Sequence, residues 1–110
     1  MTQISKDNKC LTLINTFQVE PSKQQELIAL LTEATNEVVR YIPGFISSAL
    51  HRSLDGKLVT MYAQWESMEL YQKMRENKQA ADIFMKAASL ADFQGGFYEV
   101  VEVFNATLKH

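Results

Sequence analysis

The chain has 110 residues, of which 46% are hydrophobic and 22% are charged, and its formal net charge is -2. This length and balance predict one ordinary globular domain, and the weak negative charge argues against nucleic acid or an anionic membrane as a partner. No apolar run is long enough to cross a membrane, and the single cysteine, Cys10, cannot form an internal disulfide. We therefore expect a cytoplasmic protein in which Cys10 is a structural thiol.

The first predicted elements are a strand and a helix. Residues 1–9 are polar and are expected to be flexible, whereas residues 10–19 are rich in β-branched and aromatic side chains and predict a strand. Ser22 and Gln25 have the spacing of a capping box, in which each side chain satisfies a backbone amide at the start of a helix. The apolar periodicity that follows predicts an amphipathic helix up to the breaker Pro43-Gly44.

A β-hairpin is predicted next. Residues 45–54 and 57–66 both read as strands, and Asp55-Gly56 between them is typical of a two-residue turn. The two strands should therefore be antiparallel neighbours. Along the second of them, the side chains that alternate from Val59 to Trp65 form a wholly apolar face.

The last third of the chain predicts a second helical region and a fourth strand. Ser67 marks the N-cap of the helical region, within which Asn77 either breaks the helix or restarts it. Residues 94–96 are predicted as a loop and residues 97–107 as the strand. The order β-α-β-β-α-β predicts an α+β, ferredoxin-like domain over residues 10–110, with a four-stranded antiparallel sheet and helices on one face.

The opposite face of the predicted sheet carries a large apolar set. Its members, or their alternates if the facing is reversed, are Ile14, Ile46, Leu50, Leu54, Tyr62, Val100 and Phe104. A contiguous apolar face of this size usually marks an interface. Two protomers that pack sheet on sheet would cover it, so we expect a homodimer.

Two adjoining segments resemble a known family. PGFISSALHRSLDG (residues 43–56) and LVTMYAQWESMELY (residues 58–71) are similar to the antibiotic biosynthesis monooxygenase (ABM) family of the dimeric α/β-barrel superfamily. The resemblance implies an eight-stranded barrel built by two protomers, each with its own cavity between sheet and helices. For some members it also implies the oxidation of phenolic or anthrone-like polycyclic substrates to quinones by O2, without flavin, haem or metal.

The resemblance extends to candidate catalytic residues. Quinone-forming members resemble this chain at His51, Trp65 and Tyr71, and they differ from it at Met61, where such enzymes can carry an asparagine, and at Leu50, which replaces a tyrosine. Haem-degrading members of the superfamily use an asparagine on the first strand, where this chain has Asn15. Their tryptophan and their iron-ligating histidine correspond here to Met74 and Ser89, so haem degradation is not expected.

Oxidation by O2 without a cofactor needs a dry apolar pocket, a proton acceptor and donors that hold an oxyanion. His51 is the candidate proton acceptor, since the other histidine, His110, is the terminal residue. Tyr71 orients the substrate or donates a hydrogen bond to it, Trp65 stacks on a planar ring, and Asn15 is an accessory donor. No metal-ligand spacing and no nucleotide-binding motif occurs, so neither a metal nor another cofactor is predicted.

Met61, Met74 and Phe84 are expected to line the substrate-binding cavity. Simpler interpretations stand beside these roles. In these, His51 is part of an exposed strand face, Trp65 is a core residue, and Asn15 is the partner of a backbone group at a bulge.

The favoured function is a small monooxygenase that oxidises an aromatic or polycyclic hydroxylated compound with O2. Two alternatives remain open. One is a ligand-binding or stress-associated dimer without catalysis, and the other is an isomerase or hydrolytic enzyme that uses His51 as a base without oxygen.

Overall fold

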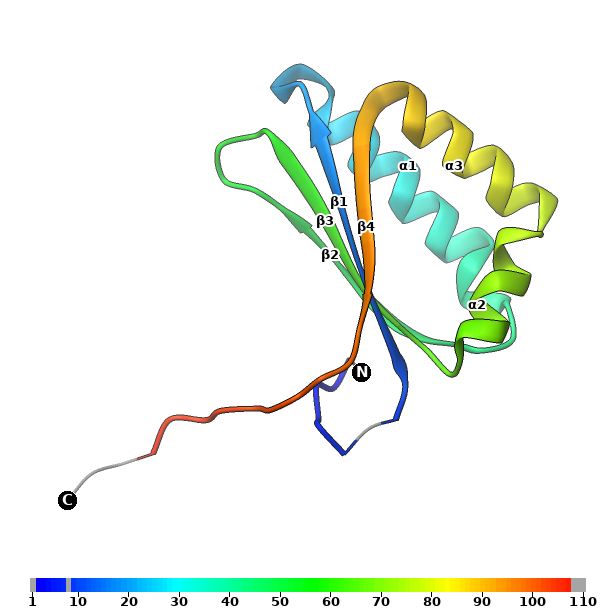
Figure 1. Cartoon of the computed structure of the whole chain (residues 1–110). Helices are drawn as coiled ribbons and strands as arrows, with labels where there is room; N and C mark the ends of the chain where they lie inside the picture. The colour runs from blue at the N-terminus through cyan, green and yellow to red at the C-terminus, as the bar shows by residue number, and fades with distance from the viewer. Residues whose placement is uncertain (1, 8, 108–110) are drawn as a thin grey trace.

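The computed structural model describes residues 2–7 and 9–107, and its centre is a four-stranded antiparallel sheet with helices packed on one face (Figure 1). The elements are β1 (Leu11–Val19), the 3-10 turn η1 (Pro21–Lys23), α1 (Gln24–Glu37), the 3-10 turn η2 (Val39–Tyr41), β2 (Phe45–Arg52), β3 (Leu58–Trp65), α2 (Met68–Arg75), α3 (Lys78–Leu90) and β4 (Ala91–Tyr98). The strands lie in the order β2-β3-β1-β4. This order confirms the predicted ferredoxin-like α+β fold. His110 lies outside the described residues.

The sheet has a helix-facing side and an outer side, and the side chains of the central strands β1 and β3 alternate between them. Strict alternation along β3 buries Val59, Ala63 and Trp65 beneath the helices, with exposed fractions of 0%, 4% and 1%. On β1, Leu13 and Phe17 belong to the same buried clusters. The apolar face that the sequence predicted for the third strand is therefore the core of the domain.

A β-bulge in β2 changes which of its side chains face the helices. The pairing register with β3 shifts between Phe45 and Ser47, so Ile46 is the extra residue. Leu50 consequently packs against the helix-side cluster, and its predicted place on the uncovered face is wrong. Alternation alone misplaced it because the inserted residue exchanges the two faces for every position that follows.

The hairpin between β2 and β3 is confirmed, but its turn spans residues 53–57 and is longer than the predicted Asp55-Gly56 pair. The carboxylate of Asp55 accepts hydrogen bonds from the hydroxyl of Ser53 at 2.7 Å and from the backbone amide of Lys57 at 3.0 Å. These bonds, the Ser53 one first, hold the pKa of the Asp55 carboxyl below its usual value. The Asp55 side chain thus helps to hold residues 53–57 in a turn.

Strand β4 begins six residues earlier than predicted (residue 91 instead of 97) and ends at Tyr98 instead of Thr107. Gly95 and Gly96, which were predicted as loop, pair with Asn15 and Ile14 inside the sheet. Glycine weakens a strand in isolation, but it is suited to a position where neighbouring side chains occupy the space of a Cβ atom. Tertiary contacts therefore outweigh the local signal here.

The start of α1 differs from the predicted capping box. Ser22 lies in η1, and the helix begins at Gln24 without a side-chain cap, because Pro21 first opens a 3-10 turn. The buried Gln24 amide instead donates to the backbone carbonyls of Ser53 and Leu58, at 3.2 and 3.0 Å. These bonds attach the helix start to the hairpin. The helix itself ends at Glu37, and η2 fills the rest of the predicted span.

The second helical region is divided as its polar residues indicate. The Ser67 hydroxyl accepts from the amide of Leu70 at 3.2 Å at the start of α2, and the Asn77 side chain accepts from the amide of Ala80 at 3.0 Å at the start of α3. Asn77 therefore both ends the first helix and caps the second. The break turns α3 along the sheet toward β4 (Figure 1).

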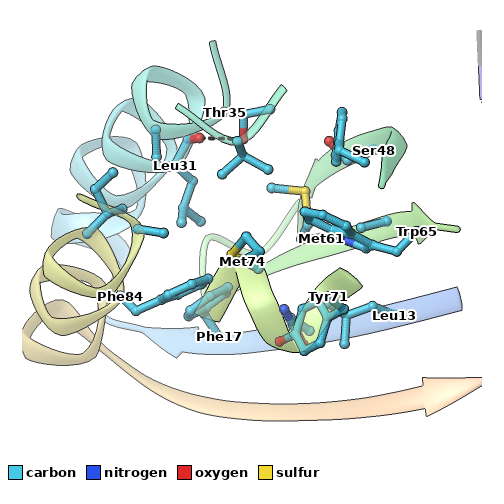
Figure 2. Close-up of a pocket in the computed structure, with 17 residues that line it drawn as sticks. Leu13, Phe17, Leu31, Thr35, Ser48, Met61, Trp65, Tyr71, Met74 and Phe84 are labelled. Atoms are coloured by element: carbon cyan, nitrogen blue, oxygen red, sulfur yellow. Dashed lines mark hydrogen bonds between the residues drawn. The ribbon is translucent and has the colours of Figure 1, made fainter. Parts of the chain in front are cut away.

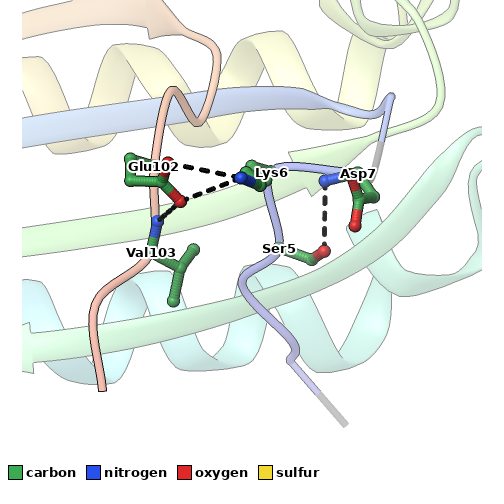
Figure 3. A network of polar contacts seen from close by, with 5 residues as sticks. All are labelled: Ser5, Lys6, Asp7, Glu102 and Val103. Atoms are coloured by element: carbon green, nitrogen blue, oxygen red, sulfur yellow. Dashed lines mark hydrogen bonds and ion pairs between the residues drawn. The ribbon is translucent and has the colours of Figure 1, made fainter. Parts of the chain in front are cut away.

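The segments before β1 and after β4 lie beside each other. Lys6 forms an ion pair with Glu102 at 3.2 Å, and Ser5 accepts a hydrogen bond from the amide of Asp7 (Figure 3). Both charged groups are half-exposed, and exposed pairs of this kind contribute little to stability. Nearby, the carbonyl of Gln3 accepts from Gln64 of β3 at 2.7 Å. No helix in the described residues is long and apolar enough to cross a membrane.

Candidate active site

A cavity lies between the helix-facing side of the sheet and the three helices, and the close-up in Figure 2 shows the side chains around it. Its volume is about 60 Å³. Strands β1, β2 and β3 and helices α1, α2 and α3 all contribute to the wall. Among the lining residues are six that the sequence singled out, namely Asn15, Met61, Trp65, Tyr71, Met74 and Phe84.

Aromatic rings form a continuous row along one side of the cavity. Trp65 contacts Phe45 with ring centroids 5.4 Å apart and Tyr71 with centroids 5.8 Å apart, and Tyr71 contacts Phe97 of β4 at 5.3 Å. All three pairs are edge-on, the arrangement that the ring quadrupoles favour. Phe45, Trp65 and Tyr71 of this row line the cavity, and Phe97 continues the row beyond it.

Tyr71 is the only ionisable side chain among the residues that line the cavity. It is 4% exposed, and its hydroxyl oxygen accepts a hydrogen bond from the guanidinium of Arg75 at 3.1 Å. The same guanidinium lies over the ring of Phe84, 4.7 Å from its centroid. Sequence reasoning missed Arg75, although its position one helical turn after Tyr71 is a signal that such a contact forms.

Asn15 brings an unsatisfied polar group to the apolar wall. The residue is 7% exposed, and its side-chain carbonyl oxygen has no hydrogen-bond partner in the described part of the chain. Gly95 lies opposite on β4, and a Cβ atom built there would collide with that oxygen. The hydroxyl of Thr35, also on the wall, is satisfied because it donates to the carbonyl of Leu31 at 2.9 Å. The amide oxygen of Asn15 is thus buried against Gly95 without a hydrogen-bond partner in the described part of the chain.

His51 is not part of the cavity. Ser48 and Leu50 of β2 face the helices, so the alternation places His51 on the outer side of the sheet, opposite Thr60 of β3, where it is exposed. This position corresponds to the simpler interpretation of His51 as part of an exposed strand face. The structure brings six of the seven predicted site residues together and leaves this one apart.

The cavity is smaller than a typical ligand site. Its volume of about 60 Å³ holds a few water molecules, at roughly 10–15 Å³ each, whereas small-molecule sites measure roughly 300–1,000 Å³. A polycyclic ligand therefore enters only if wall side chains move. Met61 and Met74 are suited to this, because an unbranched thioether chain changes its rotamer readily.

Replacing Gly95 by alanine tests the space reserved for Asn15. The new methyl group would collide with the Asn15 amide and lie 2.7 Å from Cζ of Phe93. We expect Gly95→Ala to lower the free energy of unfolding by about 1–3 kcal/mol, as overpacking does, measured by urea denaturation.

The matched control is Gly96→Ala, the neighbouring position on the outer side. There the methyl group would lie 2.8 Å from the hydroxyl of Tyr98, whose ring is 52% exposed and can move away. The expected cost is below about 1 kcal/mol. Equal costs at the two positions would contradict the special packing of Asn15 against Gly95.

The family model described as "Antibiotic biosynthesis monooxygenase" matches residues 10–86. A relative from Streptomyces glaucescens, tetracenomycin-F1 monooxygenase, is 36% identical over 107 residues, which cover 97% of this chain and 96% of that protein.

Two solved structures are similar over nearly the whole chain. A monooxygenase from the gene ActVA-Orf6 of Streptomyces coelicolor, in complex with the ligand nanaomycin D, has a TM-score of 0.81 and 27% identity, covering 94% of this chain and 100% of that chain. SnoaB, a cofactor-independent oxygenase from Streptomyces nogalater, has a TM-score of 0.73 and 16% identity, covering 90% and 100% of the two chains. At that identity, the likeness to SnoaB shows the fold alone.

Proposed function

The chain belongs to the antibiotic biosynthesis monooxygenase family, and from this premise we propose that it is a cofactor-independent monooxygenase acting on an aromatic or polycyclic hydroxylated compound. The observation that carries the proposal is the cavity, whose wall is apolar apart from a few polar groups and combines an aromatic row with Tyr71 and Asn15. Relatives named as monooxygenases, and one bound to nanaomycin D, support the same class of reaction.

The substrate supplies the electrons in such a reaction. For an anthrone probe, the methylene group opposite the carbonyl loses a proton, and the resulting anion gives one electron to O2. The substrate radical and superoxide then join through a carbon–oxygen bond, and the peroxide takes up a proton. Its O–O bond breaks with loss of water, so one oxygen atom remains as the new quinone carbonyl and the other leaves as water.

The residues that line the cavity can supply the hydrogen-bond donor and the apolar surface that these reaction steps need. Negative charge develops on the substrate oxygen when the proton leaves, and the hydroxyl of Tyr71 is the donor we assign to it. The aromatic row positions the planar rings, with Trp65 as its centre. The amide of Asn15 binds a further polar group of the substrate, while Met61 and Met74 adapt to its shape.

Oxygen uptake tests the proposal directly. The purified protein is assayed in an oxygen electrode with a panel of anthrones, naphthols and hydroquinones. The buffer contains a metal chelator and no NADH or flavin. We expect uptake of one O2 per molecule of quinone formed, above the autoxidation rate measured with heat-denatured protein.

Two other results would contradict the proposal and support an alternative. Trp65 is the only tryptophan, so quenching of its fluorescence reports binding of the probe in the cavity. Quenching without oxygen uptake supports a ligand-binding protein. Rearrangement of the probe under anaerobic conditions supports an isomerase of the same fold.

The proposed mechanism also needs an acceptor for the proton that leaves the substrate. His51 was predicted for this role, but it lies on the outer side of the sheet and does not line the cavity, so we assign the proton to water instead. We expect His51→Ala to retain most of the oxygen uptake, whereas Tyr71→Phe lowers kcat about a hundredfold, as loss of an oxyanion donor does. A loss of tenfold or more in His51→Ala with an intact fold would restore His51 as the acceptor.

We also propose that two copies of the chain pair through the outer side of the sheet. This side carries the exposed Tyr98, and the segment beyond β4 exposes Val101 and Phe104 with fractions of 81% and 88%. Ile14 of β1 and Tyr62 of β3 lie opposite each other on the same side and are only half-buried by the chain itself. Apolar surface of this extent favours association.

Analytical ultracentrifugation tests the pairing. We expect the wild-type protein to sediment at twice the chain mass of 12.6 kDa. Tyr98→Glu should raise the dissociation constant by at least about tenfold, because the charge must be desolvated at the interface. Met85→Glu, at an exposed position on the helix side, should not change it. A monomeric wild type, or equal effects of the two variants, would contradict this interface.

A further inference from the structure

Arg75 is an exposed residue that connects two walls of the cavity. It ends α2, one turn after Tyr71, and its guanidinium reaches both the hydroxyl of Tyr71, at 3.1 Å, and the ring of Phe84 on α3, at 4.7 Å from the centroid. Both contacted side chains line the cavity, whereas Arg75 does not. Within the described part of the chain, Lys6 and Glu102 form an ion pair, whereas no carboxylate pairs with Arg75.

The direction of the hydrogen bond has a chemical consequence. A guanidinium can only donate, so the oxygen of Tyr71 is the acceptor in this contact. The hydrogen of that hydroxyl is therefore left to donate elsewhere. A donor whose own oxygen accepts from a cation is polarised, and it binds a negatively charged oxygen more strongly than an isolated phenol does.

The contact with Phe84 acts on the shape of the cavity. A cation over the face of an aromatic ring is attracted by the ring quadrupole, and the interaction restrains the ring. Phe84 belongs to α3, is half-buried and lines the cavity, so the orientation of its ring affects how much space a ligand finds. Arg75 thereby restrains the ring of Phe84 and leaves the hydroxyl hydrogen of Tyr71 to donate to another group.

We propose that Arg75 is a positioning residue, which presents the Tyr71 hydroxyl as a polarised donor to the substrate oxygen and holds Phe84 against the substrate. The inference rests on the proposed oxidation and adds a residue to it. Because Arg75 acts through Tyr71 on charge that develops during the reaction, its loss should lower kcat more than it raises KM.

The experiment uses the full-length protein and the anthrone probe that supports oxygen uptake. Arg75→Gln should lower kcat about tenfold, the effect of losing one charge-assisted hydrogen bond. Arg75→Lys should recover part of the loss, because the ammonium keeps the charge but not the planar fork. Lys73→Gln, which removes an exposed cation from the same helix turn, should leave kcat unchanged.

A double-mutant cycle separates this role from a structural one. In a Tyr71→Phe background the acceptor oxygen is absent, so adding Arg75→Gln should lower kcat by less than about twofold further. Thermal unfolding, monitored by circular dichroism, shows whether each variant folds. An undiminished tenfold effect in the Tyr71→Phe background would overturn the inference, as would wild-type kcat in Arg75→Gln.

The two proposals fail in different ways. If the wild-type protein takes up no oxygen with any probe of the panel, the proposed function fails, and the role of Arg75 in it fails as well. If the wild type is active and Arg75→Gln behaves like Lys73→Gln, only the role of Arg75 is overturned.

Discussion

The burial of Trp65 at the junction of β3 and α2 is the interaction on which the rest of the structure depends. Its indole is 1% exposed and packs edge-on against Phe45 of β2 and Tyr71 of α2. Just after it, the amide of Glu66 donates to the carbonyl of Gly44 at 2.8 Å, which ties the start of β2 to the end of β3. Edge-on aromatic pairs add about 0.5–1.5 kcal/mol each beyond burial. One side chain thus attaches a strand pair to a helix and sets the direction in which that helix leaves the sheet.

The cavity chemistry follows from that direction. Helix α2 leaves the sheet so that Tyr71 joins the cavity wall and Arg75 stands one turn further, at the surface. Asn15 reaches the same space from β1, where its unpartnered amide oxygen carries a desolvation cost of about 1–3 kcal/mol. Beside Asn15, the wall of the cavity carries the hydroxyls of Tyr71, Thr35 and Ser48. The cavity thus combines apolar and aromatic side chains with a few polar groups.

Local patterns in the sequence predicted much of this arrangement, and their failures have identifiable causes. Alternation along β3 and the caps at Ser67 and Asn77 were right, because each depends on neighbouring residues only. Leu50 was misplaced by the bulge at Ile46, which leaves no mark in the alternation. The glycines of β4 were read as a loop for a similar reason. Their role depends on side chains of β1 and β4 that meet them only in the folded sheet.

By itself, the sequence determined the order of the elements, the ferredoxin-like fold and six residues of the cavity wall, because periodicity and strand–helix junctions are local properties. Only the tertiary structure decided which face each side chain of β2 occupies, and so removed His51 from the cavity. It also brought Arg75 to Tyr71 and Phe84 at once. Because Arg75 of α2 contacts Phe84 of α3, its position depends on the angle between these two helices. That angle is set by the packing of the helices on the sheet.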